Sequence, residues 1–206
     1  MPTSVAPTRK LTLDEFFAMD FPEDGAKREL VNGEVVVTPA PNMPHKRVQS
    51  FLHEWFGFFR FKHPAFKSYS ELNLTLWEGH HAIPDFVIAR LESDGGPCNE
   101  SELFLEGPPD VAVEVLSPTK QWRDLVQKRS EYERGGVPEY WLFDPAEAKA
   151  LFLRLDSGRY REAEVPLGGI YDCASVPGLR LDVDALFRGD LHAAVAALGS
   201  GFPGHE

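Results

Sequence analysis

The stretch from residue 110 to residue 144 constrains the fold more than any other part of the chain. Residues 110–116 (DVAVEVL) are almost continuously apolar, which is typical of a central strand covered on both faces. A helix is predicted over about 120–134, ending at Gly135-Gly136, and residues 139–144 (EYWLFD) predict the next strand. Two strands joined by a helix form a parallel β-α-β unit with a right-handed crossover. We therefore expect an α/β protein.

The flanking segments extend this sheet and cover it. Residues 44–62 predict a long helix whose apolar residues fall on one face: Val48, Phe51, Leu52, Trp55, Phe56 and Phe59. Further strands are predicted over 66–77, with Leu72, Leu74 and Leu76 on one face, and over 83–89. Turn signals at Asn32-Gly33 and at Asp156-Ser157-Gly158 predict hairpins over 28–38 and 149–166. We expect a mixed sheet with the long helix on one face and the second helix on the other.

The length of 206 residues suits a single domain. We expect a flexible N-terminal arm over 1–11, the folded domain over 12–188 and a C-terminal tail over 189–206. No apolar run approaches 18 residues, and the first ten residues lack a signal peptide's hydrophobic stretch, so we expect a cytoplasmic protein without a membrane segment. Two cysteines without zinc-ligand spacing exclude a disulfide framework or a Cys/His zinc module.

Charge narrows the functional classes. The net charge of −11 excludes a broad basic surface that binds duplex DNA by charge alone. The charge is also uneven: residues 78–116 hold nine acids and one base, or 1 − 9 = −8, whereas residues 44–70 hold five bases and one acid, or 5 − 1 = +4. Such a division fits a cation site beside a phosphate-binding surface, and it also fits ordinary solvated loops and helix faces.

Two carboxylates stand within apolar strands. Glu114 lies inside VAVEVL, where a buried carboxylate is costly unless it is paired, protonated or bound to a metal. Asp85 follows Pro84 at the start of another apolar segment. Together these two residues predict a site for Mg²⁺ or Mn²⁺, because both ions favour hard oxygen ligands. A salt bridge for Glu114 and a turn role for Asp85 are the structural alternatives.

The helix after Glu114 offers a cationic partner. If Trp122, Leu125, Val126 and Tyr132 define its apolar face, Arg129 points near the centre of that face and Lys128 lies roughly 95° away. Geometry alone therefore does not select Lys128. Either side chain could instead extend along the edge of the core, or Lys128 could pair with Asp124 one turn earlier.

The sequence resembles the Uma2 family, also called DUF820, of predicted endonucleases with the PD-(D/E)XK restriction-endonuclease-like fold. The resemblance extends from about residue 12 to residue 187. Its motifs occur in order: RELVNGE with Glu29, Pro84-Asp85, VAVEVLSP with Glu114, the helix with Asp124, Lys128 and Tyr132, and GGVPEYWLFDP. This resemblance implies a restriction-endonuclease-like mixed central sheet flanked by helices, with an N-terminal hairpin and C-terminal β additions.

The resemblance also implies roles for particular residues. Asp85 and Glu114, with Val115, would bind the metal, and Glu29 would complete the site. Leu116 stands where many such nucleases have lysine, and Lys128 on the following helix would replace it. The candidates for contact with phosphate are His45, Gln49, Lys46, Lys120 and Arg123. Outside the resemblance, His45 is a helix-start or surface histidine, and His80-His81 a surface turn.

These observations predict a metal-dependent endonuclease that hydrolyses DNA phosphodiester bonds. One alternative is a non-catalytic or partner-dependent nucleic-acid-binding module on the same fold, which would have Lys128 turned away from the site. Another is a carboxylate-metal phosphohydrolase acting on a small substrate. Because the chain shows no helix-turn-helix, zinc finger or basic tail, a separate DNA-recognition partner fits the pattern. A homodimer would bring two cleavage centres to one duplex.

Overall fold

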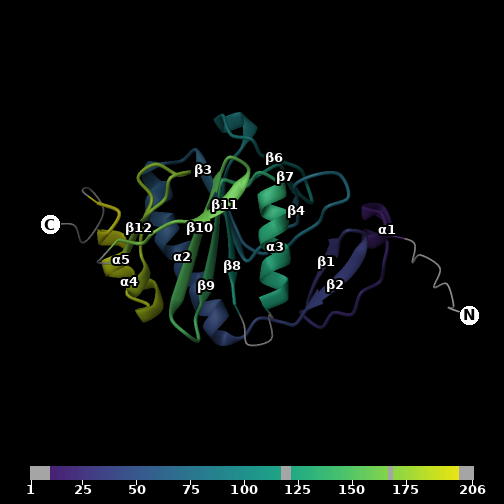
Figure 1. The fold of residues 1–206 in the computed structure, drawn as a ribbon, viewed down its shortest axis with the longest axis horizontal. Helices are drawn as coiled ribbons and strands as arrows, with labels where there is room; N and C mark the ends of the chain where they lie inside the picture. The colour runs from purple at the N-terminus through teal and green to yellow at the C-terminus, as the bar shows by residue number, and fades with distance from the viewer. Residues whose placement is uncertain (1–9, 117–121, 167–168, 200–206) are drawn as a thin grey trace, which may run out of the picture.

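The computed structural model describes residues 10–116, 122–166 and 169–199, and its centre is a six-stranded sheet of order β11-β10-β9-β8-β5-β3 (Figure 1). β8 and β9 pair in parallel, and every other neighbouring pair in this sheet is antiparallel. The expected mixed sheet and the parallel β8-α3-β9 unit are confirmed. The elements of the sheet and the crossover are β3 (Phe66–Tyr69), β5 (Phe86–Arg90), β8 (Val111–Val115), α3 (Trp122–Arg134), β9 (Glu139–Asp144), β10 (Lys149–Asp156) and β11 (Arg159–Glu162).

Helices cover both faces of the sheet, because the buried strands carry apolar side chains on both sides. On one face, α2 (Met43–Lys62) packs its predicted apolar stripe against β8 residues such as Val113. On the other face, Tyr132 of α3 packs against Ala112 and Tyr140. Figure 1 shows α3 in front of the sheet and α2 behind it. The expected arrangement, with one helix on each face, is confirmed.

Smaller elements surround this core. The remaining elements are α1 (Leu13–Phe17), β1 (Lys27–Val31), β2 (Glu34–Thr38), β4 (Leu74–Thr75), the 3₁₀ turn η1 (Glu92–Asp94), β6 (Asn99–Glu100), β7 (Leu105–Glu106), β12 (Ile170–Asp172), β13 (Arg180–Asp182), α4 (Val183–Arg188) and α5 (Leu191–Ala196). The β1-β2 hairpin turns at Asn32-Gly33, where both residues have positive φ as a two-residue hairpin requires. Within the expected tail, α5 packs on α2, so this segment belongs to the core. Most of the expected N-terminal arm, residues 1–9, lies outside the description.

Three local expectations are wrong. The predicted strand 66–77 is split, because Glu71 adopts a left-handed φ of 53° between β3 and β4, which belong to different sheets. His80 and His81 do not form a surface turn: both are buried, at 2% and 0% exposure. Arg129 does not point into the apolar face of α3 but is exposed, while Lys128 is buried.

The orientation of α3 has a clear cause. Val126, used to place the apolar face, is 52% exposed. The face that meets the protein instead carries Lys128, Glu131 and Tyr132, and Gly135 continues it by leaving Leu76 the space that a Cβ would fill. These positions recur at i, i+3, i+4 and i+7, which is the spacing of one helix face. Hydrophobicity could not reveal this face because two of its residues are charged and one is glycine.

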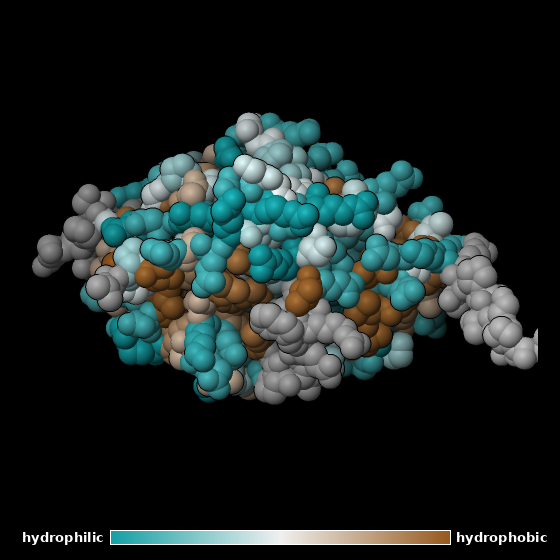
Figure 2. Space-filling view, viewed as in Figure 1, coloured by the Kyte–Doolittle hydropathy of each residue, from teal (hydrophilic) through white to brown (hydrophobic). Residues whose placement is uncertain are grey.

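Surface composition differs across the view of Figure 2. Hydrophilic residues dominate its upper half, whereas apolar residues reach the surface mainly in the middle and lower parts. Among the described residues, no helix combines the length and the apolar character needed to cross a membrane.

Candidate active site

The two predicted carboxylates meet where β5 begins and β8 ends. The register pairs Phe86 with Val113, and extending it by one position places Asp85 opposite Glu114. The Asp85 N–H also donates to the Val113 carbonyl at 3.1 Å, which continues the ladder beyond β5. Asp85 and Glu114 are 0% and 1% exposed. The antiparallel pairing thus brings two acids 29 positions apart in sequence to one end of the sheet.

Backbone and helix contacts fix Asp85. Its Oδ2 accepts a hydrogen bond from the Val115 N–H at 2.7 Å, so Val115 lies beside the carboxylate. From α2, the Gln49 side chain donates to the Asp85 carbonyl at 2.9 Å. His45, 3% exposed, places Nε2 3.3 Å from Asp85 Oδ1, although neither ring nitrogen completes a hydrogen bond with the described residues. His45 is therefore buried at the start of α2, not on the surface.

Lys128 joins the other two acids. Its ammonium contacts Glu29 Oε1 and lies 3.0 Å from Glu114 Oε1. Burial would lower the pKa of Lys128, but Glu114 and Glu29 more than offset this and hold the pKa above its ordinary value. Glu114 Oε1 also accepts from the Tyr132 hydroxyl at 2.9 Å. Burial, followed by the charge of Glu114, raises the pKa of Tyr132, so this hydroxyl remains a donor.

The β1-β2 hairpin supplies two of the site's charges. Lys27 and Glu29 share one face of β1 because they are two residues apart. Glu29 accepts from the Ile83 N–H at 2.5 Å as well as from Lys128, while the Lys27 ammonium contacts Asp85 Oδ1. Sequence reasoning identified Glu29 but missed Lys27. The alternation of β1 carried the signal, since a residue two positions before a site residue faces the same way.

The predicted phosphate contacts have different outcomes. Gln49 and His45 lie at the site, as described above. Lys46 lies at its edge, where its 42% exposed side chain donates to Glu71 at 2.9 Å. Lys120 lies outside the described residues, and so does the side chain of Arg123. Their contacts with phosphate remain predictions.

The side chains at this end of the sheet include oxygen donors of the kind that a divalent metal needs. Among the described residues, no group of three or more His, Cys, Asp or Glu side chains forms a metal-binding cluster. The chemistry nevertheless fits a cation, because three buried carboxylates (Glu29, Asp85, Glu114) gather here beside the Lys27 and Lys128 ammonium groups. Carboxylate oxygens are hard ligands suited to Mg²⁺ or Mn²⁺. The Lys27 and Lys128 ammonium groups contact these carboxylates and supply part of the positive charge that buried carboxylates need.

Comparisons with known proteins bear on the family and the fold. The model of the Uma2 family, described as "Putative restriction endonuclease", matches residues 13–184. A crystal structure of "a putative nuclease belonging to DUF820" from Anabaena variabilis superposes with a TM-score of 0.71 at 21% sequence identity. The match covers 86% of this chain and 98% of that one, so the two share a fold. No curated protein matches the sequence.

Proposed function

Since this chain belongs to the Uma2 family, whose description points to a nuclease, we propose that it is a metal-dependent endonuclease that hydrolyses DNA phosphodiester bonds at the Asp85–Glu114 site. The observation that carries the proposal is the gathering of three buried carboxylates, those of Glu29, Asp85 and Glu114, at one end of the central sheet. Asp85 and Glu114, with the backbone of Val115, would hold Mg²⁺ or Mn²⁺. Such an ion supplies neutralisation of the scissile phosphate and activation of a water for in-line attack.

Lys128 acts as a fixed positive charge in this proposal. Its raised pKa keeps the ammonium protonated at neutral pH, so Lys128 serves as a hydrogen-bond donor and not as a general base. The ammonium, next to Glu114, stabilises the negative charge that develops on the phosphate. Glu29 orients this ammonium from the hairpin. The contacts of Lys128 with Glu29 and Glu114 favour this role over an orientation away from the site, and the metal affinity of the site distinguishes the proposal from a non-catalytic module.

Other residues prepare the site without entering the reaction. Gln49 holds the main chain of Asp85, and the Val115 N–H fixes one oxygen of its carboxylate. The exposed Lys46, with Lys120 and Arg123, would follow the phosphate backbone of the DNA. Because the net charge is −11, these few contacts favour weak DNA binding by the isolated chain.

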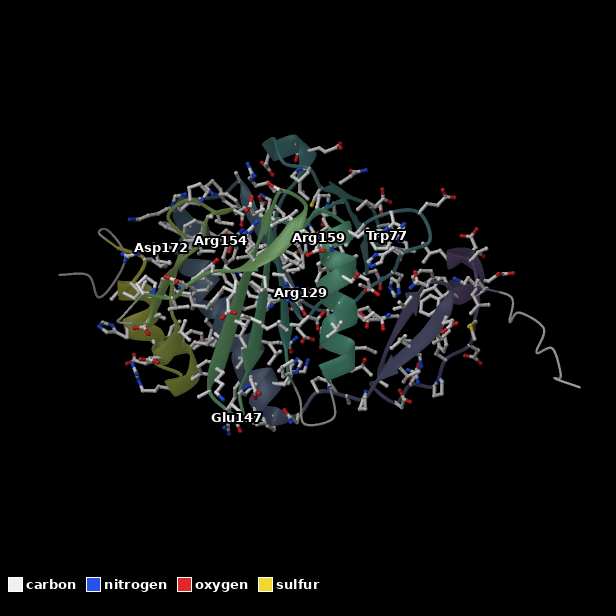
Figure 3. All side chains as sticks on the ribbon, viewed as in Figure 1. Trp77, Arg129, Glu147, Arg154, Arg159 and Asp172 are labelled. Atoms are coloured by element: carbon white, nitrogen blue, oxygen red, sulfur yellow. The ribbon has the colours of Figure 1, made fainter. Side chains whose placement is uncertain are left out.

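Cleavage assays test the proposal. Purified protein is incubated with supercoiled plasmid, linear duplex and single-stranded DNA in Mn²⁺, Mg²⁺ or EDTA. We expect cutting that needs the metal and falls by at least about a hundredfold in Asp85→Asn and Lys128→Met, the scale of losing one catalytic electrostatic contact. Asp172→Asn provides the matched control, because this aspartate, labelled in Figure 3, is 67% exposed and pairs with Arg180 of β13.

Three outcomes contradict parts of the proposal. Cutting that persists in Asp85→Asn at the wild-type rate assigns the activity to a contaminant or to another site. Equal losses in Asp172→Asn and Asp85→Asn show a general effect of substitution. If folded wild-type protein cuts none of the three substrates with either metal, the isolated chain is not a DNA endonuclease.

A further inference from the structure

Lys27 holds a position that neither the motif pattern nor the family match assigns. Its side chain is 12% exposed, and its ammonium contacts Oδ1 of the fully buried Asp85. The same ammonium lies 3.6 Å from Glu71 Oε1. A lysine from the hairpin therefore neutralises one of the two proposed metal ligands.

The two oxygens of Asp85 are not equivalent. The Val115 N–H donates to Oδ2, whereas Lys27 contacts Oδ1 and His45 approaches it. A metal ion bound to Oδ1 would lie beside the Lys27 ammonium, and two cations repel each other at that distance.

We propose that Lys27 is the resident counter-cation of Asp85, which a divalent metal ion must displace to bind. This inference rests on the proposed role of Asp85 as a metal ligand. Lys27 keeps the buried carboxylate neutralised in the metal-free protein and lowers the affinity for the metal by competing with it. It is a residue that regulates access to the site, not one that holds the metal.

The surroundings provide a place for the displaced ammonium. Glu71 is 37% exposed and already lies between Lys27 and Lys46, so a small movement keeps Lys27 paired with a carboxylate. The flexible four-carbon stem of lysine permits such a movement. Glu29, two residues along β1, continues to hold the hairpin through Lys128. Displacement of Lys27 therefore does not require the hairpin to detach.

Calorimetric titration with Mn²⁺ alone, without DNA, tests this competition. We expect Lys27→Met to bind Mn²⁺ at least about tenfold more tightly than the wild type, which corresponds to about 1.4 kcal/mol. Lys67→Met is the matched control, because Lys67 is a partly buried lysine 3.7 Å from a different carboxylate, Asp94. Its Mn²⁺ affinity is expected to equal that of the wild type. An unchanged or weaker affinity in Lys27→Met, or equal tightening in Lys67→Met, overturns the inference.

A charge-preserving variant and thermal unfolding keep the test decisive if Lys27→Met is unstable. Lys27→Arg retains the competing charge and is expected to bind Mn²⁺ as the wild type does; tighter binding contradicts competition. Mn²⁺ is expected to raise the Tm of Lys27→Met more than that of the wild type, because tighter binding to the folded state stabilises it more. An equal or smaller rise overturns the inference.

The outcomes also separate this inference from the proposed function. If the wild type binds Mn²⁺ and Lys27→Met gains no affinity, the competition is wrong while the metal site stands. If neither protein binds Mn²⁺, the metal premise of both proposals is wrong. If Lys27→Met binds Mn²⁺ and the wild type does not, the Lys27 ammonium competes strongly enough to exclude the metal, which supports the inference.

Discussion

Two buried acidic sites lie at opposite ends of the parallel pair β8-β9, and they are stabilised in different ways. Glu114 stands near the end of β8 with Asp85 and Glu29, and lysine ammonium groups contact these carboxylates. Glu139 begins β9 opposite Val111, at the other end, and is 1% exposed. Glu139 accepts hydrogen bonds from Trp141 Nε1, the Tyr171 hydroxyl and the N–H groups of Ala174 and Ser175, at 2.6–3.0 Å.

The two sites differ in how easily the groups that contact the buried carboxylates can move away from them. Backbone N–H groups cannot move away from Glu139 without unfolding the segment between β12 and β13. Arg154, labelled with Asp172 in Figure 3, adds a positive charge 3.8 Å from the Glu139 carboxylate. At the other end, the Lys27 ammonium stands on a flexible four-carbon stem, and we propose that a metal ion displaces it. The contacts of Glu139 therefore anchor the C-terminal hairpin, whereas our proposal has the Asp85 end exchange one cation for another.

The largest effect is expected from a substitution of Glu139. Glu139→Ala leaves two backbone N–H groups, an indole and a phenol without their acceptor, and each such buried group costs about 1–3 kcal/mol. We expect the free energy of unfolding to fall by at least about 3 kcal/mol, measured by urea denaturation. Mn²⁺ is not expected to recover this loss, because the Glu139 end exchanges no cation.

Glu147→Ala is the control for that variant. Glu147 lies in the turn between β9 and β10, and its side chain is 63% exposed (Figure 3). Its replacement is expected to change the free energy of unfolding by no more than about 0.5 kcal/mol. If Glu139→Ala is equally mild, the hydrogen bonds around Glu139 do not anchor the hairpin, and the contrast between the two ends fails.

The second prediction concerns the stability that the Lys128 ion pairs contribute. Lys128→Met leaves the carboxylates of Glu29 and Glu114 without their shared ammonium, and breaking a buried ion pair in this way costs about 3 kcal/mol. Glu29→Gln removes one of the two acids. The double variant is therefore expected to lose less stability than the sum of the single variants, with a coupling energy of about 1–3 kcal/mol.

Denaturation in the presence of Mn²⁺ completes this cycle. The metal is expected to recover more stability in Lys128→Met than in the wild type, because it replaces a missing positive charge. Additive effects of the two substitutions would show that Lys128 and Glu29 do not act as a pair. Recovery by Mn²⁺ in Glu139→Ala but not in Lys128→Met would reverse the assignment of the two ends.

Sequence reasoning reached the sheet and the acids because strong local signals specify both. Continuous apolar residues predicted β8, the Asn32-Gly33 turn predicted the hairpin, and the helical repeat from Val48 to Phe59 predicted α2. Asp85 and Glu114 stood out because carboxylates are rare within apolar strands. Their meeting at one end of the sheet follows from the antiparallel pairing of β5 and β8.

The remaining features depend on contacts that no local pattern records. Lys128 is buried because carboxylates from β1 and β8 compensate its charge, so the helix face that carries it is not hydrophobic. Glu71 breaks the predicted strand 66–77 through a backbone conformation that glutamate rarely adopts. Glu139 looked like an ordinary strand residue, since its partners at Tyr171, Ala174 and Ser175 come from more than 30 positions away.

The smallest effect is expected from His81, whose protonation makes the stability of the site end depend on pH. His81 forms a β-bridge with Leu30, next to Glu29, and burial lowers its pKa from 6.5 to about 4, with further lowering by His80 and Lys128. The unfolded chain therefore binds a proton on His81 as the pH falls below 6.5, while the folded protein resists until about pH 4. Stability is accordingly lost on acidification through this interval.

His81→Gln removes the titrating group and is expected to reduce the slope of unfolding free energy against pH between about 6.5 and 4. Asn73, whose side-chain oxygen lies 3.0 Å from His81 Nε2, remains available to the glutamine amide. Hydrogen exchange localises the effect: acid is expected to increase exchange in β1 of the wild type before it does so in β9, where Glu139 has no histidine among its recorded partners in the described residues. Earlier exchange in β9, or an unchanged slope in His81→Gln, would contradict the assignment of this acid sensitivity to His81.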